Sequence, residues 1–165
     1  MRALRRSLPL ALLLLACSRE PAPVAPAGPP ELKVVAAEAD PAAPGTELYL
    51  EGQKAFIEGR FEDAADSYRR SLLQHRSART YHAMGDALYA QQRFRDAAEA
   101  YREAVKLEPD KWFSWLRLGR SLIETGNSGE AVEAFRKAQA LKPADGAAYR
   151  GEAEAHVWAK HYDRA

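Results

Sequence analysis

The only thiol in the chain is that of Cys17. It lies between an apolar run, Leu8 to Ala16, and a stretch from Pro21 to Pro44 that holds seven of the ten prolines. A disulfide within the chain would need a second cysteine, and there is none. No helix or strand pattern surrounds Cys17 that would bury it in a core. Its chemistry must therefore be set by the segment in front of it.

That segment has the layout of a secretory signal peptide. Three arginines lie among the first six residues, and nine residues without a charge follow. The run is too short for a permanent membrane span, which needs roughly 20 apolar residues. We therefore predict that residues 1–16 direct export and are removed.

The residues Leu14-Leu15-Ala16-Cys17 resemble the lipobox of bacterial lipoproteins. The resemblance implies that the Cys17 thiol receives a diacylglycerol and that cleavage leaves it as a lipidated N-terminus. Ser18 stands where an aspartate would imply retention at the inner membrane. The implied location is the bacterial cell envelope, lipid-anchored at the outer membrane and facing the periplasm. The alternative is an ordinary signal peptide with a chance cysteine.

The other reactive side chains form no catalytic or metal-binding pattern. The four histidines fall into pairs seven and five residues apart, whereas a helical metal-binding pair needs a spacing of four. No serine lies in a G-x-S-x-G motif, and no glycine-rich loop could hold a phosphate. We expect no catalytic residues, no metal, no cofactor and no enzymatic activity. With 24 basic and 23 acidic residues, a general nucleic-acid binder is also excluded.

After the cysteine, residues 17–45 form a segment rich in proline and alanine. Proline favours extended conformations, so this segment is predicted to be a disordered tether with a reach on the order of 80 Å. The remaining chain, residues 46–165, carries the pattern of a folded domain.

Small residues recur in that domain with nearly constant spacing. Alanines follow one another at intervals of 33, 34 and 34 residues, and a second small position repeats with the same intervals. A bulky side chain stands four residues before each member of the second set. The first set is Ala64, Ala97, Ala131 and Ala165; the second is Gly52, Gly85, Gly119 and Ala153.

This pattern resembles the tetratricopeptide repeat (TPR) family, whose unit is a helical hairpin of 34 residues. The resemblance implies an all-α solenoid of about three and a half repeats, near residues 45–77, 78–111, 112–145 and, incomplete, 146–165. Seven helices are predicted, near residues 46–58, 61–75, 78–91, 94–107, 112–125, 128–141 and 145–159. Ser128 replaces the usual aromatic residue, which predicts a loosely packed third turn.

The fourth repeat ends at Ala165, where its second helix should begin. Solenoid repeats bury their faces against neighbours, so an uncapped end exposes apolar surface. Either the last helix is the cap, or the sequence is a fragment of a longer protein, which we favour.

The resemblance also implies a concave groove lined by the first helix of each repeat. The residues expected in this groove are Tyr49, Gln53, Phe56, Arg79, His82, Asp86, Tyr89, Phe113, Leu116, Arg117, Arg120, Arg150 and Glu154. Chaperone-binding members of the family hold a terminal carboxylate with a Lys/Asn clamp, which Tyr49, Gln53 and His82 do not reproduce. Aromatic residues interleaved with arginines favour a peptide of acidic character. The alternative is a solvated surface without a partner.

Together these features predict a membrane-anchored, non-catalytic adaptor that binds a protein or peptide partner in its groove. Envelope assembly, such as the biogenesis of pilus secretins or outer-membrane complexes, is the expected setting. Two alternatives stay open: a structural repeat protein that forms homo-oligomers, and the N-terminal piece of a larger TPR protein.

Overall fold

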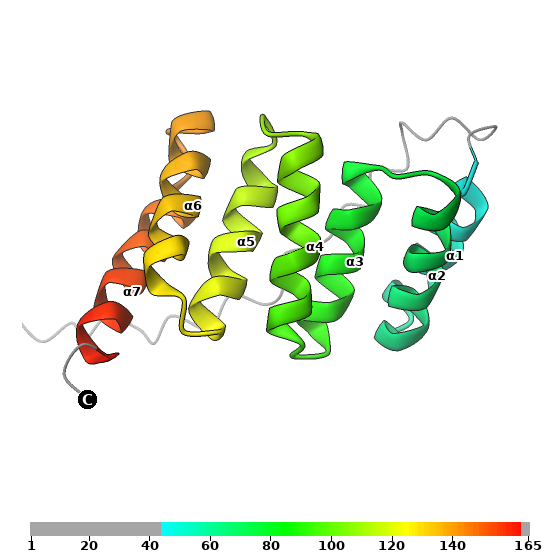
Figure 1. Ribbon diagram of the computed structural model, residues 1–165, viewed down its shortest axis with the longest axis horizontal. Helices are drawn as coiled ribbons and strands as arrows, with labels where there is room; N and C mark the ends of the chain where they lie inside the picture. Colours follow the sequence, from blue (N-terminus) through cyan, green and yellow to red (C-terminus); the bar gives the residue numbers. More distant parts are fainter. Residues whose placement is uncertain (1–43, 163–165) are drawn as a thin grey trace, which may run out of the picture. The chain divides into compact units, whose positions relative to one another are not determined.

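The computed structural model describes residues 44–162, which form seven helices (Figure 1). Their bounds are α1 Thr46–Ile57, α2 Phe61–Gln74, α3 Ala78–Ala90, α4 Phe94–Leu107, α5 Trp112–Glu124, α6 Ser128–Leu141 and α7 Gly146–Tyr162. The described part contains no strand, so the predicted all-α solenoid is confirmed. The last helix extends beyond its predicted end at residue 159. Cys17 and the predicted tether lie outside the described residues, except for the last residues of the tether range.

The helices pack against their neighbours in chain order, and Figure 1 shows them side by side from α1 to α7. Contacts also join α1 to α3 and α5 to α7, which are first helices of successive repeats. Side chains on these first helices can therefore meet across repeat boundaries.

Glycines set the distance between the two helices of each hairpin. A Cβ atom built on any of three glycines would lie 2.6–2.8 Å from the nearest ring carbon of the facing aromatic residue. Real Cβ atoms do not approach carbon so closely, so these positions require glycine at this helix separation. The pairs are Gly52 with Tyr68, Gly85 with Tyr101, and Gly119 with Phe135.

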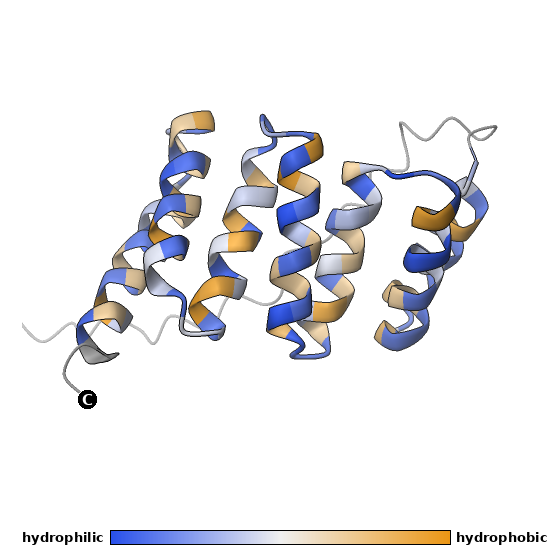
Figure 2. Ribbon diagram, viewed as in Figure 1, coloured by the Kyte–Doolittle hydropathy of each residue, from blue (hydrophilic) through white to orange (hydrophobic). Residues whose placement is uncertain are grey.

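Each helix has one apolar face, and hydrophobic and hydrophilic residues alternate along the ribbons in Figure 2. The repeating alanines Ala64, Ala97 and Ala131 are completely buried, as are Tyr101 and Phe135. The regular spacing of small residues in the sequence therefore marks the core of the solenoid.

The turns inside the hairpins need a left-handed backbone residue. Gly59 (φ 76°) and Gly126 (φ 80°) supply it in the first and third repeats. In the second repeat the same place is taken by Gln92, with φ 61°. A side chain at this backbone angle is uncommon, and Gln92 is the one such residue other than glycine in the described part of the chain.

Aromatic pairs close the first two of these turns. Phe56 and Phe61 meet edge to face with centroids 5.3 Å apart, and Tyr89 and Phe94 with centroids 5.0 Å apart. The third turn has Ser128 instead, whose buried Oγ has no hydrogen-bond partner among residues 44–160. The third turn thus lacks the aromatic pair of the other two.

The fourth repeat has only its first helix within the described residues. Ala153, the repeat-spaced small residue, is exposed. Gly151, two residues earlier, is buried instead and lies against Phe135 of α6. The sequence pattern did not indicate this second glycine contact on Phe135.

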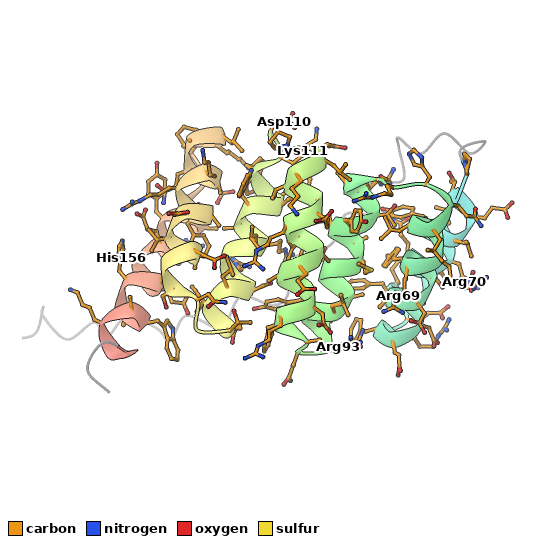
Figure 3. All side chains as sticks on the ribbon, in the orientation of Figure 1. Arg69, Arg70, Arg93, Asp110, Lys111 and His156 are labelled. Atoms are coloured by element: carbon orange, nitrogen blue, oxygen red, sulfur yellow. The ribbon has the colours of Figure 1, made fainter. Side chains whose placement is uncertain are left out.

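Ion pairs connect successive repeats on the surface. They are Arg76–Glu103 (2.9 Å), Arg102–Glu130 (2.6 Å) and Arg136–Glu152 (2.8 Å). Pairs this exposed contribute about 0–1 kcal/mol each. Figure 3 shows other charged side chains on the surface, including Arg70 of α2. Within residues 44–162, none of the helices has the length and apolar character that crossing a membrane requires.

Candidate functional site

At the boundary between the first two repeats, Tyr49 of α1 meets Arg79 of α3. The Tyr49 hydroxyl accepts hydrogen bonds from Arg79 Nε and Gln53 Nε2, both at 2.9 Å. The Arg79 guanidinium also lies over the Tyr49 ring, 4.7 Å from its centroid. The structure therefore brings together three of the residues predicted to line the groove.

A second cluster is centred on Asp86 of α3. Its Oδ1 accepts a hydrogen bond from the Tyr101 hydroxyl at 2.6 Å and lies 3.4 Å from Nε of Arg117 on α5. Its Oδ2 lies 3.5 Å from His82 Nε2, one helical turn away. The side chain of Asp86 is only 15% exposed, so these partners offset its loss of hydration.

Burial lowers the pKa of His82, and Arg117 lowers it further, although the nearby Asp86 carboxylate opposes both effects. His82 is therefore neutral at neutral pH. Burial and then Asp86 raise the pKa of Tyr101 well above 10, which keeps its hydroxyl protonated as a donor. Phe113 of α5 meets the His82 ring edge to face, with centroids 4.8 Å apart.

His82 also lies beside a serine, because Ser114 Oγ of α5 is 3.1 Å from His82 Nδ1. Serine, histidine and aspartate in such a chain have the composition of a nucleophilic triad. However, Ser114 is only 3% exposed, so a substrate could not reach its hydroxyl. The Asp86 carboxylate is also shared with Tyr101 and Arg117. We interpret these side chains as a buried polar network that fixes α3 against α5.

Farther along α3, Tyr89 faces the end of α5. Burial raises the pKa of Tyr89, the Glu124 carboxylate adds to this rise, and Arg120 and Arg117 oppose it. The carboxylate of Glu124 and the guanidinium groups of Arg120 and Arg117 therefore lie near the Tyr89 hydroxyl. Arg120 is half-buried and forms no hydrogen bond or ion pair with another described residue.

On α7 the predicted residues Arg150 and Glu154 are exposed. Neither takes part in an ion pair within the described part of the chain. The α7 helix packs against α5, and Arg150 occupies the repeat position that His82 and Leu116 hold in the two preceding repeats.

We call this surface the first-helix face. It comprises Tyr49, Gln53, Arg79, His82, Asp86, Tyr89, Phe113, Arg117, Arg120, Arg150 and Glu154. Tyr49 is itself buried, and its hydroxyl contributes to this face through its hydrogen bonds with Arg79 and Gln53. Of the other two predicted residues, Leu116 is also buried and Phe56 packs on Phe61 at a turn.

Sequence reasoning missed three residues that contact this face, namely Tyr101, Ser114 and Glu124. Tyr101 could have been found from its hydroxyl, because Phe135 at the equivalent place of the third repeat shows that the core position does not need one. Among residues 44–160 no group of three metal-binding side chains comes together.

Comparisons with known proteins agree with this architecture. The sequence model of the tetratricopeptide repeat matches residues 82–148 and 116–165, which together make up half of the chain. No curated protein shows a significant match to the sequence.

Solved TPR structures superpose on the helices. The first TPR of Spaghetti (RPAP3) bound to the HSP90 peptide SRMEEVD has a TM-score of 0.66 at 18% identity, covering 69% of this chain and 91% of that one. The Sgt2 TPR domain from Aspergillus fumigatus has a TM-score of 0.65 at 22% identity, covering 73% and 82%. The TPR2B domain of yeast Sti1 in its pHsp70 complex has a TM-score of 0.61 at 20% identity, covering 72% and 97%. At these identities the likeness establishes the fold.

Proposed function

The chain belongs to the tetratricopeptide repeat family, and from this premise we propose that it is a non-catalytic adaptor that binds an acidic peptide segment of a partner protein on the first-helix face. The observation that carries the proposal is a pair of arginines, Arg120 and Arg150, without ion-pair partners among the described residues. Arg120 lies one helical turn from Arg117, whose position is fixed by Asp86, and Arg150 lies on α7, which packs against α5.

Fixed side chains favour binding because less conformational entropy is lost when the partner arrives. Arg79 is held by Tyr49, and Arg117 by Asp86. Phe113 is 38% exposed and offers an aromatic contact on the same face. The surface therefore combines a rigid aromatic residue with guanidinium groups.

Arginine favours carboxylates, because its planar guanidinium can donate two parallel hydrogen bonds to one carboxylate group. The peptide SRMEEVD that is bound to the related TPR of RPAP3 carries three acidic residues. This likeness supports an acidic ligand for the present chain. We expect the sequence of this ligand to differ from SRMEEVD, because the Lys/Asn clamp of chaperone-binding members is not reproduced at Tyr49, Gln53 and His82.

A peptide selected from a random display library on the full chain provides the test. Arg120→Ala and Arg150→Ala should each weaken its binding by about 5- to 30-fold, which corresponds to about 1–2 kcal/mol for a charge-assisted hydrogen bond. Arg70→Ala on α2 is the matched control and should change nothing, because Arg70 lies outside the first-helix face. Equal effects of all three substitutions would refute the proposed face.

The setting proposed for this adaptor is the bacterial envelope, at the outer membrane, where a lipid on Cys17 anchors the chain and the partner belongs to an assembly machinery. A firm anchor needs two or more acyl chains. Cys17→Ala should move the protein from the membrane fraction to the soluble fraction without changing its helical circular dichroism. Retention of the variant in the membrane fraction would contradict lipid anchoring.

Self-association is the second candidate, and exposed apolar residues at both ends of the solenoid favour it. Leu50 and Ile57 of α1 are exposed at one end, and Tyr149 and Val157 of α7 at the other. Solenoid ends of this kind can stack on a second copy. Sedimentation equilibrium would exclude this candidate if the protein is monomeric at every concentration.

A further inference from the structure

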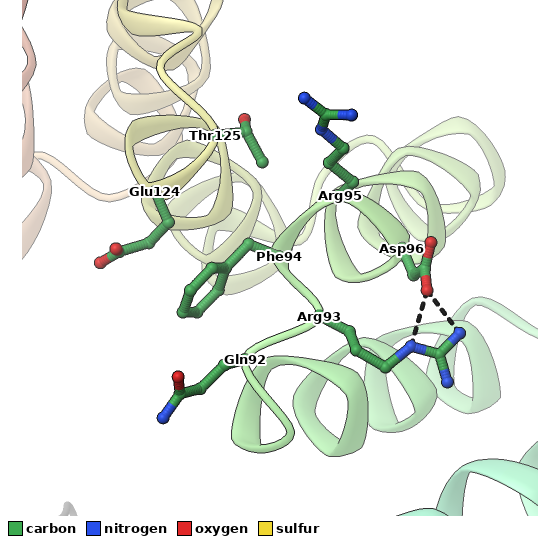
Figure 4. A pocket seen from close by; sticks show the side chains of 7 residues that line it. All are labelled: Gln92, Arg93, Phe94, Arg95, Asp96, Glu124 and Thr125. Atoms are coloured by element: carbon green, nitrogen blue, oxygen red, sulfur yellow. Dashed lines mark hydrogen bonds and ion pairs between the residues drawn. The ribbon is translucent and has the colours of Figure 1, made fainter.

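The turn between α3 and α4, together with the end of α5, encloses a shallow cavity of about 360 Å³. Seven residues line it, and Figure 4 shows their side chains. The cavity lies next to Tyr89, at the edge of the first-helix face. A peptide on that face would therefore reach it.

The two lining residues Arg93 and Asp96 neutralise each other. Arg93 Nε and Nη2 lie 2.7 Å and 2.5 Å from Asp96 Oδ2. In Figure 4 this pair lies on one side of the turn, away from Phe94 and Glu124. Arg95 also lines the cavity, and in Figure 4 its guanidinium points away from the Phe94 ring, whereas the Glu124 side chain lies beside the ring. The charge nearest to a ligand on the Phe94 ring is therefore that of Glu124.

Glu124 is exposed and forms no ion pair with any described residue. Figure 4 shows the Phe94 ring with the Glu124 side chain on one side and the Gln92 side chain on the other. The ring orientation is fixed by Tyr89, which meets it edge to face at 5.0 Å. The cavity thus places a carboxylate, an aromatic ring and an amide around one space.

We propose that this cavity binds a cationic side chain, lysine or arginine, of the peptide that occupies the first-helix face. A carboxylate attracts the cation, the face of an aromatic ring stabilises it, and the amide oxygen of Gln92 can accept one of its hydrogen bonds. This inference rests on the proposed function and extends it. The ligand would carry acidic residues over Arg120 and a basic residue over Glu124.

The other turns lack these groups. In the first repeat the equivalent places of Gln92 and Glu124 are taken by Gly59 and Ala90. In the third repeat Ser128 replaces the ring. The TPR fold therefore does not require the combination.

Gln92 supplies a further argument. Its left-handed backbone (φ 61°) suits glycine, which the two other turns contain. A glutamine here is less favourable for folding than glycine. A side chain that contacts a ligand would account for its presence.

The test uses Nα-acetyl-L-arginine amide as the probe, titrated into the ¹⁵N-labelled full chain and followed by NMR. Saturable shifts are expected at the amides of Gln92, Phe94 and Thr125, with millimolar affinity. Nα-acetyl-L-norleucine amide, which has no charge, should produce none of these shifts. Shifts that spread over the surface, or that the norleucine probe reproduces, would overturn the inference.

Substitutions complete the test. Glu124→Gln should weaken arginine binding about fivefold or more, because it removes the charge and keeps the size. Glu99→Gln on α4 is the matched control, since Glu99 is exposed and lies outside the cavity. Gln92→Gly should weaken binding about twofold while raising thermal stability. An unchanged affinity in Glu124→Gln would overturn the inference.

These outcomes are independent of the proposed function, because the free amino-acid probe requires no acidic peptide. Loss of arginine binding in Glu124→Gln, with no effect of Arg120→Ala on selected acidic peptides, would keep the subsite and refute the adaptor face. The reverse pattern would refute the subsite alone.

Discussion

Gly151→Ala is expected to destabilise the last repeat, although alanine normally favours a helix. A Cβ atom at Gly151 would lie less than 3.0 Å from three atoms of the Phe135 ring. Gly119 of α5 approaches the same ring atoms, with its own Cβ position 2.8 Å from the ring, so the ring has little room to move away. Phe135 is completely buried, so either the ring or α7 must shift.

The magnitude follows from two opposing effects. Overfilling a packed core costs about 1–3 kcal/mol, whereas replacing glycine by alanine inside a helix gains about 1 kcal/mol. The ring is completely buried and close to two glycines, which favours the upper part of the first range. A net loss of about 1–2 kcal/mol in the free energy of unfolding is therefore expected.

Gly129→Ala in α6 provides the matched control, because no atom lies within 4 Å of its Cβ position. This variant should gain about 0.5–1 kcal/mol from helix propensity alone. Urea denaturation measures both variants, and hydrogen exchange should show faster exchange in α7 of Gly151→Ala. The packing argument would be refuted if both variants were stabilised to a similar extent.

Three more outcomes are expected. Because folding lowers the pKa of His82, the unfolded chain binds a proton more readily below pH 6.5, and the free energy of unfolding should fall there by up to about 1.4 kcal/mol per pH unit and be unaffected by His82 above that pH. Urea denaturation at several pH values should show a flatter profile for His82→Gln, and an unchanged profile would contradict the assignment. Arg117→Met should lower the free energy of unfolding, measured by urea denaturation, by about 1–3 kcal/mol because Asp86 loses a partner. Arg69→Met, which breaks the exposed pair with Asp66, should lower it by less than about 0.5 kcal/mol, and equal losses would argue against a buried network. Ser128→Ala should raise the free energy of unfolding by about 1 kcal/mol, because it removes a buried hydroxyl without a hydrogen-bond partner. A loss of stability in thermal denaturation would show that the hydroxyl does form a hydrogen bond.

The fold could be predicted because the same packing contacts recur in every repeat and require the same residue types at a constant spacing. Gly52, Gly85 and Gly119 mark close helix approaches, and their regular spacing places every hairpin. Gly151 could not be found in this way, because it packs on Phe135 outside the repeat spacing.

The candidate site could be predicted only in part. The position of a residue within the repeat indicates which helix face it occupies, and this grouped Tyr49 with Arg79 and Asp86 with Arg117. Exposure depends on neighbours that the position does not reveal, so Leu116 proved to be buried. Glu124 was missed because its relation to Phe94 and Tyr89 arises from packing between two repeats.

Site-specific photo-crosslinking in the native host tests the central claim most directly. A photoreactive amino acid at Phe113 reports on the first-helix face, and the same amino acid at Leu73 of α2, which is 84% exposed, serves as the control. Capture of one partner at an acidic segment from position 113, lost in Arg120→Ala and absent from position 73, is the expected result. Capture from position 73 alone, or equally from both positions, would contradict binding on the first-helix face.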